Sequence, residues 1–387
     1  MVATIHRVTA GNGYLYYLRN IAANDTTARG RSSLADYYSA HGEAPGRWQG
    51  SGLAALDIPP GAEVTESQME SLFGLGIHPN AEQIEEQVYA HQITLGVNDR
   101  EATRAAEKAS KLGNKFAVYE AHSQYRQQCS DAFRTHNSEQ NLPPTTAIPD
   151  DERARIRTQV ATEIFTTEYE RAPLNARELS GWVAKNSRPK HAAVAGFDIT
   201  FSPVKSVSVL WALASPDVSK RIEAAHRRAI EDALSWLENN AVFTRLGRNG
   251  IRQVDVEGIV AAGFTHRDSR AGDPDLHTHV LIANRVRTLD GKWRTIDSKT
   301  LHEAVVTASE IFDSRIEHHL ETDLNLQFEA RLGRTPDQVQ IREIVGIPLE
   351  LIEAWSQRGA AIVARLDQLT AAFQTTFGRE PSPKGDL

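Results

Sequence analysis

Three histidines stand close together in the segment GFTHRDSRAGDPDLHTHVLIAN. His277 and His279 are two positions apart in an apolar stretch, and side chains two apart on a strand leave the same face. His266 ends the preceding apolar stretch, and the polar loop between them would turn the chain back antiparallel. The pattern therefore predicts a hairpin with three imidazoles on one face.

Three imidazoles with an open fourth position are what a catalytic divalent metal ion needs. Imidazole suits zinc, manganese or nickel better than magnesium, which prefers oxygen. We expect Mg, Mn or Zn, with the identity left open. A closed structural zinc site is disfavoured because Cys129 is the only cysteine. The competing interpretation of any single histidine is a hydrogen bond to the backbone.

The elements around these histidines predict an α+β fold with an antiparallel central sheet and helices mainly on one face. Residues 4–9 and 192–201 are typical of strands, and 215–240 is typical of a helix. Several strands follow that helix. A long helix is predicted over 300–324, with Thr300 and Glu303 spaced as a capping box.

The composition is that of a soluble globular protein, with 40% hydrophobic and 24% charged residues. The sequence contains no apolar run long enough to span a bilayer and no secretory signal. A cytoplasmic protein is therefore expected. The net charge of −7 does not favour nucleic acid, but the acidic excess is concentrated in residues 61–110, whereas 244–300 hold ten basic and seven acidic residues.

Together with two further segments, the histidine motif resembles the HUH-class conjugative relaxases, specifically the MobF (TrwC/TraI-like) group. The segment GFDITFSPVKSVS at 196–208 is similar to the group's strand-to-helix motif. The tyrosine-rich N-terminus followed by GRWQGSGL is similar to its opening. The resemblance covers residues 1 to about 58 and about 191 to 330, and it implies an HUH palm built on the central sheet.

The resemblance implies site- and strand-specific nicking and strand transfer at a plasmid origin of transfer. The DNA would be bound as a hairpin plus single strand. A tyrosine would attack the scissile phosphate and leave a 5′-phosphotyrosyl link. The implied partners are this DNA, the type IV secretion coupling machinery and an accessory protein, without membrane insertion. The protein would pass with the DNA into the recipient cell.

The resemblance also implies roles for individual residues. Tyr14 is the first candidate nucleophile, followed by Tyr16 and then Tyr17, and a second nucleophile would be Tyr37 or Tyr38. Asp198 matches the group's acidic residue, which would orient a histidine or accept the phenol proton. Packing is the competing interpretation of most of these tyrosines, and a capping or hydrogen-bonding carboxylate is that of Asp198.

Basic residues in the matching segments are candidate DNA contacts. Lys205 stands at a predicted helix start, where a phosphate could meet the free amides. Arg270 lies in the loop between the histidines, and ion pairing with a loop aspartate is its alternative. The remaining candidates are Arg245, Arg248, Arg285 and Arg287.

A single relaxase domain is expected over 1–387. Its parts are a nucleophile-bearing segment 1–60, a mainly helical insertion 61–190, the metal-binding palm 191–330 and a helical C-terminal part 331–387. The full-length protein is expected to continue into a helicase.

Three alternatives remain open. One is another HUH enzyme, either a rolling-circle replication initiator or a transposase. The second is a three-histidine metalloenzyme that does not act on DNA, such as a hydrolase or an oxygenase. The third is a DNA-binding module whose catalytic site is defunct.

Overall fold

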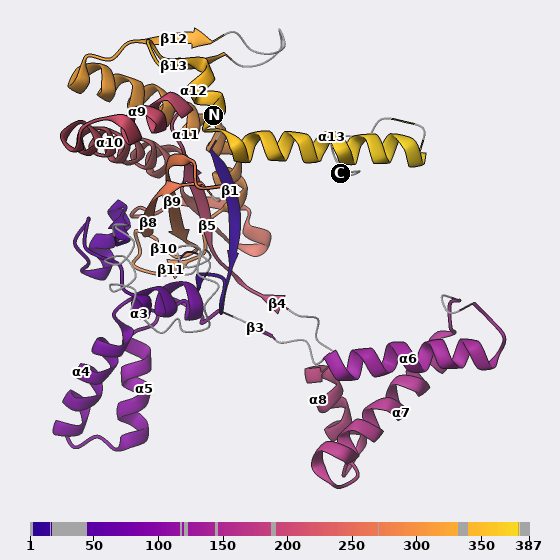
Figure 1. Ribbon diagram of the computed structural model, residues 1–387. Helices are drawn as coiled ribbons and strands as arrows, with labels where there is room; N and C mark the ends of the chain where they lie inside the picture. The colour runs from indigo at the N-terminus through magenta and orange to yellow at the C-terminus, as the bar shows by residue number, and fades with distance from the viewer. Residues whose placement is uncertain are drawn as a thin grey trace. The chain divides into compact units, whose positions relative to one another are not determined.

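The computed structural model describes residues 3–15, 17, 45–116, 118–119, 123–143, 146–186, 191–269, 271–331, 340–377 and 379. The chain divides into two compact units (Figure 1). Unit 1 comprises Met1–Lys115 and Val194–Leu387, and unit 2 comprises Phe116–Ala193. None of the helices in the described part of the chain is both long and apolar enough to cross a membrane.

A five-stranded antiparallel sheet organises unit 1, with the strand order β1-β5-β9-β8-β2. The predicted α+β fold with a central antiparallel sheet is thereby confirmed. The strands are β1 (Thr4–Thr9), β2 (Arg47–Gln49), β5 (Val194–Phe201), β8 (Ala261–Asp268) and β9 (Pro274–Ala283).

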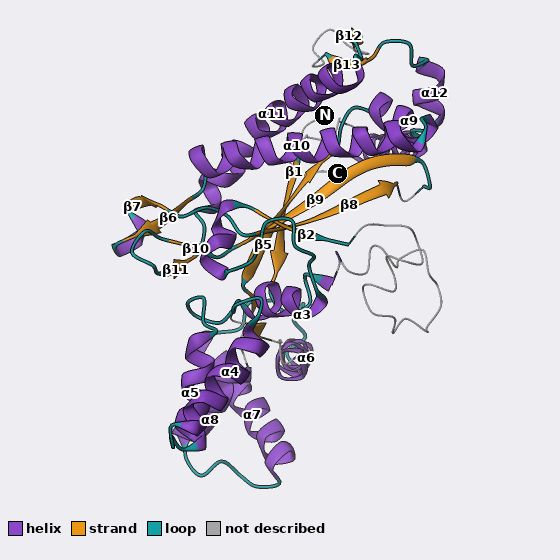
Figure 2. Cartoon of the chain, turned by 90° about the vertical axis from the view of Figure 1, so that its left-hand side faces the viewer, coloured by secondary structure: helices purple, strands orange, loops and turns teal. Residues whose placement is uncertain are grey.

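Two long helices, α10 (Pro216–Asn240) and α11 (Ser298–Leu324), lie across one face of this sheet (Figure 2). Their apolar residues share a buried core with alternate strand positions such as Phe197, Ile199 and Val280. Because side chains alternate along a strand, the intervening positions face away from the helices. The polar residues of β5, β8 and β9 that build the site lie mainly at those positions.

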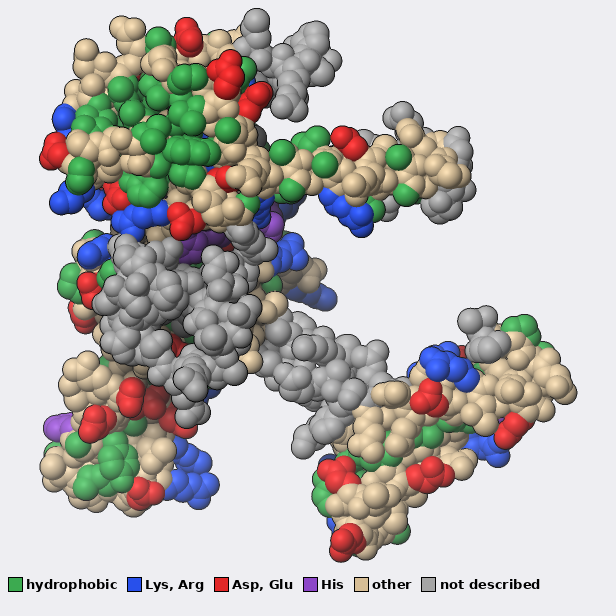
Figure 3. Space-filling model, in the orientation of Figure 1, with side chains coloured by type: hydrophobic (Ala, Val, Ile, Leu, Met, Phe, Trp, Pro, Cys, Tyr) green, Lys and Arg blue, Asp and Glu red, His purple; other side chains and the backbone are tan. Residues whose placement is uncertain are grey.

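Shorter elements complete unit 1. Two β-ribbons form from β6 with β7 and from β10 with β11. The elements are η1 (Ser51–Leu56), α3 (Glu66–Met69), η2 (Glu70–Leu75), α4 (Ala81–Thr94), α5 (Asp99–Ala109), α9 (Lys205–Leu213), β6 (Phe243–Leu246), η3 (Arg248–Gly250), β7 (Arg252–Asp255), β10 (Val286–Arg287) and β11 (Trp293–Arg294). Acidic side chains are prominent over α4 and α5, in agreement with the charge count (Figure 3).

Unit 2 is a small helical body entered and left through paired strands. Strand β3 (Val118–Tyr119) pairs with β4 (His191–Ala192). Between them lie α6 (Ser123–Glu139), α7 (Asp150–Tyr169) and α8 (Ala176–Asn186). These helices bury a separate core that includes Tyr125, Cys129, Val160, Phe165 and Trp182. The mainly helical character expected for 61–190 is confirmed, while the boundary between the two units falls inside that segment.

The C-terminal region begins with strands rather than helix. Strand β12 (Phe328–Arg331) pairs with β13 (Ile341–Ile344), and α12 (Leu349–Ala354) and α13 (Gln357–Phe377) follow. Within the C-terminal part expected to be helical, 331–387, strand β13 precedes the two helices. Four residues are too few for their periodicity to distinguish a strand from a helical turn.

Candidate metal centre

The three histidines converge as the spacing predicts. His266 on β8 stands opposite His277 on β9, and His279 stands opposite Phe264. One ligand nitrogen from each of the three rings lies within 4.8 Å of the others. The ring centroids are separated by 5.2 Å, 5.3 Å and 5.3 Å. The hairpin and its loop therefore form the predicted cluster.

Hydrogen bonds fix which nitrogen two of the imidazoles present. The Nδ1 atom of His277 lies 2.7 Å from the carbonyl oxygen of Asp275, and Nδ1 of His279 lies 2.8 Å from Oδ2 of Asp198. Because a carbonyl and a carboxylate only accept, Nδ1–H is the donor in both bonds. Nε2 of each ring is left as the electron-pair donor.

The surroundings of the His266 ring differ from those of His277 and His279. Its Nε2 is buried and has no hydrogen-bond partner among the described residues. Burial, together with repulsion from His277 and His279 in their charged forms, lowers the pKa of His266 to about 3. Burial also lowers the pKa of His277, against the hydrogen bond and charge of Asp275, which raise it.

The donor set fits a divalent metal ion. Lowered pKa values keep His266 and His277 neutral at neutral pH, which is the form that binds metal. Three imidazole nitrogens, one of them buried without a partner among the described residues, match an open three-histidine site. The second carboxylate oxygen of Asp198 is also buried without a hydrogen-bond partner in the described part of the chain.

One tyrosine of the N-terminal cluster reaches this site. The ring of Tyr17 packs edge-on against His279 with 5.7 Å between centroids, and it stacks on Phe264 at 6.4 Å. Tyr14 is buried, and its ring edge lies 3.3 Å from where a Cβ on Gly74 would be. Tyr16, Tyr37 and Tyr38 lie outside the described residues.

Two of the predicted DNA contacts, Lys205 and Arg285, are largely buried. The Lys205 side chain is only 16% exposed, and its Nζ donates to the carbonyl of Pro274 at 2.5 Å. Burial lowers the pKa of Lys205, while Asp275 and Asp273 raise it. Arg285 is 5% exposed and donates to the carbonyls of Gly76 and Asn114, so its guanidinium does not lie on the surface.

The other arginines lie nearer the surface. Arg245 pairs with Asp297, and Arg287 pairs with Glu257. Arg248 is exposed at the tip of the β6–β7 ribbon, and Arg270 lies outside the described residues. Of the candidates that the structure describes, Lys205 is linked to the histidines, through Asp275.

Two residues near the site were not singled out from the sequence. Asp275 lies beside His277 and Lys205, as described above, and its position two residues before the histidine was the available signal. Arg358, on α13, is close enough for its charge to lower the pKa of His277. Because Arg358 is far from His277 along the chain, no local sequence pattern indicates that the two lie near each other.

A sheet-borne three-histidine centre with a tyrosine against it defines the class of site, and comparison with known proteins gives the family. The family model described as TrwC relaxase matches residues 10–386. The chain belongs to the TrwC relaxase family. This finding confirms the resemblance based on the three motifs.

Two relatives from Escherichia coli are both named multifunctional conjugation protein TraI. One is 33% identical over 219 residues, which is 54% of this chain and 12% of the relative. The other, from strain K12, is 31% identical over 214 residues, or 53% of this chain and 11% of the relative. The chain thus covers about an eighth of the length of these proteins.

Among solved structures, the chain is similar to two described as conjugative relaxase TrwC in complex with oriT DNA. The copper-bound form has a TM-score of 0.48 at 19% identity, with 98% of this chain and 85% of the other covered. A metal-bound form has a TM-score of 0.40 at 24% identity, with 69% and 84% covered.

Proposed function

We propose that this chain nicks one DNA strand at a plasmid origin of transfer and holds the cut end as a covalent tyrosine adduct. The observation that carries the proposal is the contact between the ring of Tyr17 and His279 within the three-histidine cluster. Membership in the TrwC relaxase family supports it. The names of the E. coli relatives, and the origin DNA bound in the TrwC structures, indicate the context.

In the reaction, a tyrosine oxygen forms a bond to the scissile phosphorus and the bond to the 3′ oxygen breaks. The phenol loses its proton, and the departing oxygen gains one. A divalent ion on His266, His277 and His279 would draw charge from the phosphate oxygens and so offset their repulsion of the attacking tyrosine. We propose Mn, Mg or Zn as candidates, since the donor chemistry does not select one.

We favour Tyr17 over Tyr14 as the nucleophile because of its contact with the histidine cluster. The ring of Tyr17 packs against a metal ligand, whereas Tyr14 packs beside Gly74. Tyr16 precedes Tyr17 directly and remains a candidate from the sequence. Tyr37 and Tyr38 remain candidates for a second transfer.

Asp198 fits the orienting role better than that of a base. One carboxylate oxygen accepts from Nδ1 of His279, which directs Nε2 of that ring to the centre of the cluster. The carboxylate is 2% exposed and needs such a partner.

We propose two arginines as phosphate contacts: Arg248, which is exposed, and Arg358, whose charge acts on His277. Arg270 remains a candidate from the sequence.

The test is adduct formation on single-stranded oligonucleotides tiled across the origin of the plasmid that encodes the protein. We expect a metal-dependent covalent band on a denaturing gel, absent with EDTA or in His277→Ala. Tyr14→Phe, Tyr16→Phe and Tyr17→Phe, assayed separately, identify the nucleophile by which variant loses the band. Tyr89→Phe, in α4, is the matched control and should retain it. Metal binding without any adduct would instead favour a metalloenzyme that does not act on DNA.

The wider cellular role is also proposed. The relatives named as conjugation proteins suggest that the adduct is passed to a secretion coupling machinery, with an accessory protein at the origin. The proposed location before transfer is the cytoplasm.

A further inference from the structure

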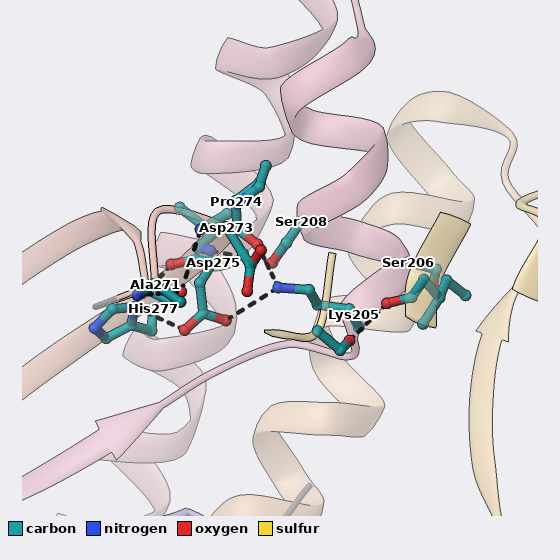
Figure 4. Close-up of polar contacts among 12 residues, drawn as sticks. Lys205, Ser206, Ser208, Ala271, Asp273, Pro274, Asp275 and His277 are labelled. Carbon is teal, nitrogen blue, oxygen red and sulfur yellow. Dashed lines mark hydrogen bonds and ion pairs between the residues drawn. The ribbon is translucent and has the colours of Figure 1, made fainter. Parts of the chain in front are cut away.

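Helix α9 reaches the segment that leads into the metal-binding strand. Lys205, the first residue of α9, donates from Nζ to the carbonyl of Pro274 at 2.5 Å (Figure 4). One turn later, Oγ of Ser208 accepts from the backbone N–H of Leu276 at 3.0 Å. Both side chains therefore lie on the same face of the helix and hold two backbone groups of residues 274–276.

This anchoring falls where the sheet itself gives less support. The pairing of β8 with β9 is regular up to His266 opposite His277, and then shifts register before Asp268 meets Pro274. Beyond this shift, the start of β9 is not held by a regular ladder of hydrogen bonds. The contacts from α9 therefore hold residues 274–276, directly before His277, where that ladder is missing.

Asp275 connects the helix to the ligand. One carboxylate oxygen of Asp275, Oδ1, lies 3.9 Å from Nζ of Lys205, and the other, Oδ2, lies 3.7 Å from Nδ1 of His277 (Figure 4). Its carbonyl accepts the Nδ1–H of the same ring at 2.7 Å. The position and tautomer of His277 thus depend on a residue that Lys205 holds on one side.

We propose that Lys205 is a positioning residue for the metal centre, acting with Ser208 through Asp275 on His277. The proposal rests on the proposed metal site. It differs from the sequence-based prediction that Lys205 contacts DNA, because the ammonium group is directed into the protein and only 16% of the side chain is exposed. Outer partners of metal ligands typically contribute about 10- to 100-fold in metal affinity.

The test measures metal affinity of the full 387-residue chain without DNA, by Co²⁺ absorption and by competition with a chromophoric zinc chelator. Lys205→Met should weaken binding by about 10-fold or more. Asp275→Asn, which keeps the side-chain shape, should weaken it in the same direction. Lys299→Met is the matched control, because Lys299 is also near a helix start but is 79% exposed. It should bind metal as the wild type does.

DNA binding in EDTA separates the two roles of Lys205. We expect Lys205→Met to keep wild-type affinity for an origin oligonucleotide and the same dependence on salt. Unchanged metal affinity in both Lys205→Met and Asp275→Asn would overturn the proposal. Weaker DNA binding with a shallower salt dependence, together with unchanged metal affinity, would overturn it in favour of a phosphate contact. A wild-type chain that binds no metal would remove the metal site itself, whereas metal binding without an adduct would contradict only the proposed nicking.

Discussion

At the scale of single residues, the site contains buried polar atoms whose burial costs free energy. Nε2 of His266 and one oxygen of Asp198 are buried without hydrogen-bond partners in the described part of the chain. A buried polar atom without a partner costs about 1–3 kcal/mol. Such a cost is expected where the atom's partner is a bound metal ion rather than another protein group.

His266→Phe should therefore separate stability from function. The substitution keeps an aromatic ring in place and removes the orphaned nitrogen. We expect the free energy of unfolding in EDTA to rise by about 1 kcal/mol, while metal binding is lost. Urea unfolding and Co²⁺ titration of the same preparation measure the two effects. Lower stability in EDTA would mean that the nitrogen has a protein or solvent partner after all.

A second buried histidine, His226, makes stability depend on pH. It lies on the helix-covered side of the sheet, where Nε2 lies 2.9 Å from Oγ1 of Thr278. Burial, with smaller effects from the charges of His277 and Arg227, lowers the pKa of His226 to about 3. The unfolded chain therefore binds a proton that the folded chain does not between pH 6.5 and about 3. The stability that this group provides is present above pH 6.5 and declines as the pH falls through this window.

His226→Gln keeps a hydrogen-bonding side chain without this titration. Between pH 7.5 and 5.5, the wild type should lose about 1.4 kcal/mol more stability than the variant. Urea unfolding in EDTA at both pH values measures the difference. His318→Gln, on the surface of α11, is the control and should follow the wild type. Equal pH dependence of the wild type and His226→Gln would show that His226 is not buried as a neutral ring.

The convergence of the histidines could be predicted from sequence, whereas the contact of Tyr17 with them could not, although Tyr17 was among the candidate nucleophiles. Alternation along a strand fixes the face of His277 and His279 whatever the rest of the fold does. The contact of Tyr17 with His279 instead depends on the path of the chain after β1, for which the sequence has no periodic signal. The sequence ranks Tyr14 before Tyr17, whereas the contact with His279 leads us to propose Tyr17, and the adduct assay on the single variants decides between them.

At the scale of elements, strand pairs and helix cores were predictable, while ends and short strands were not. The long helix predicted from Thr300 begins at Ser298, after Asp297 at the N-cap position. Thr300 donates to the Asp297 carboxylate instead of capping the helix itself. The local spacing from Thr300 to Glu303 matches a capping box, but the actual start depends on where the chain leaves β11.

Strand β5 carries Asp198 through the centre of the sheet, and Gly196 allows close packing at its beginning. A Cβ at Gly196 would lie 2.5 Å from the carbonyl oxygen of Ile282 and 3.1 Å from the ring of Phe73. Gly196→Ala must therefore move β9 or η2. We expect it to lower the free energy of unfolding by about 1–3 kcal/mol, measured in urea. Gly359→Ala, in α13, meets no atom within 4 Å and should not destabilise the protein. Wild-type stability of Gly196→Ala would show that the strands separate easily there.

At the scale of the whole molecule, the described residues of the site all belong to unit 1. Both strands of the histidine hairpin, β5 and α9 lie in that unit, and none of the cluster's histidines comes from the described residues of 61–190. Sequence patterns predicted that the insertion is helical, but not that it is divided between units 1 and 2. Helices α4 and α5 resemble α6 to α8 in polarity, so no sequence pattern marks the boundary. Which helices share a core is decided by long-range packing, as for Tyr125 with Trp182.

Unit 2 should therefore be removable without loss of the metal site. Tyr119 pairs with His191 across β3 and β4, so the chain ends that enter and leave the helices are adjacent. An Asn-Gly turn joining Tyr119 to His191 is suited to such an antiparallel pair. We expect this deletion variant to retain wild-type Co²⁺ affinity and the thermal unfolding of unit 1, because the helices bury their own core. A large loss of either would mean that unit 2 stabilises the sheet, and that the histidine centre depends on the whole chain rather than on the unit that contains it.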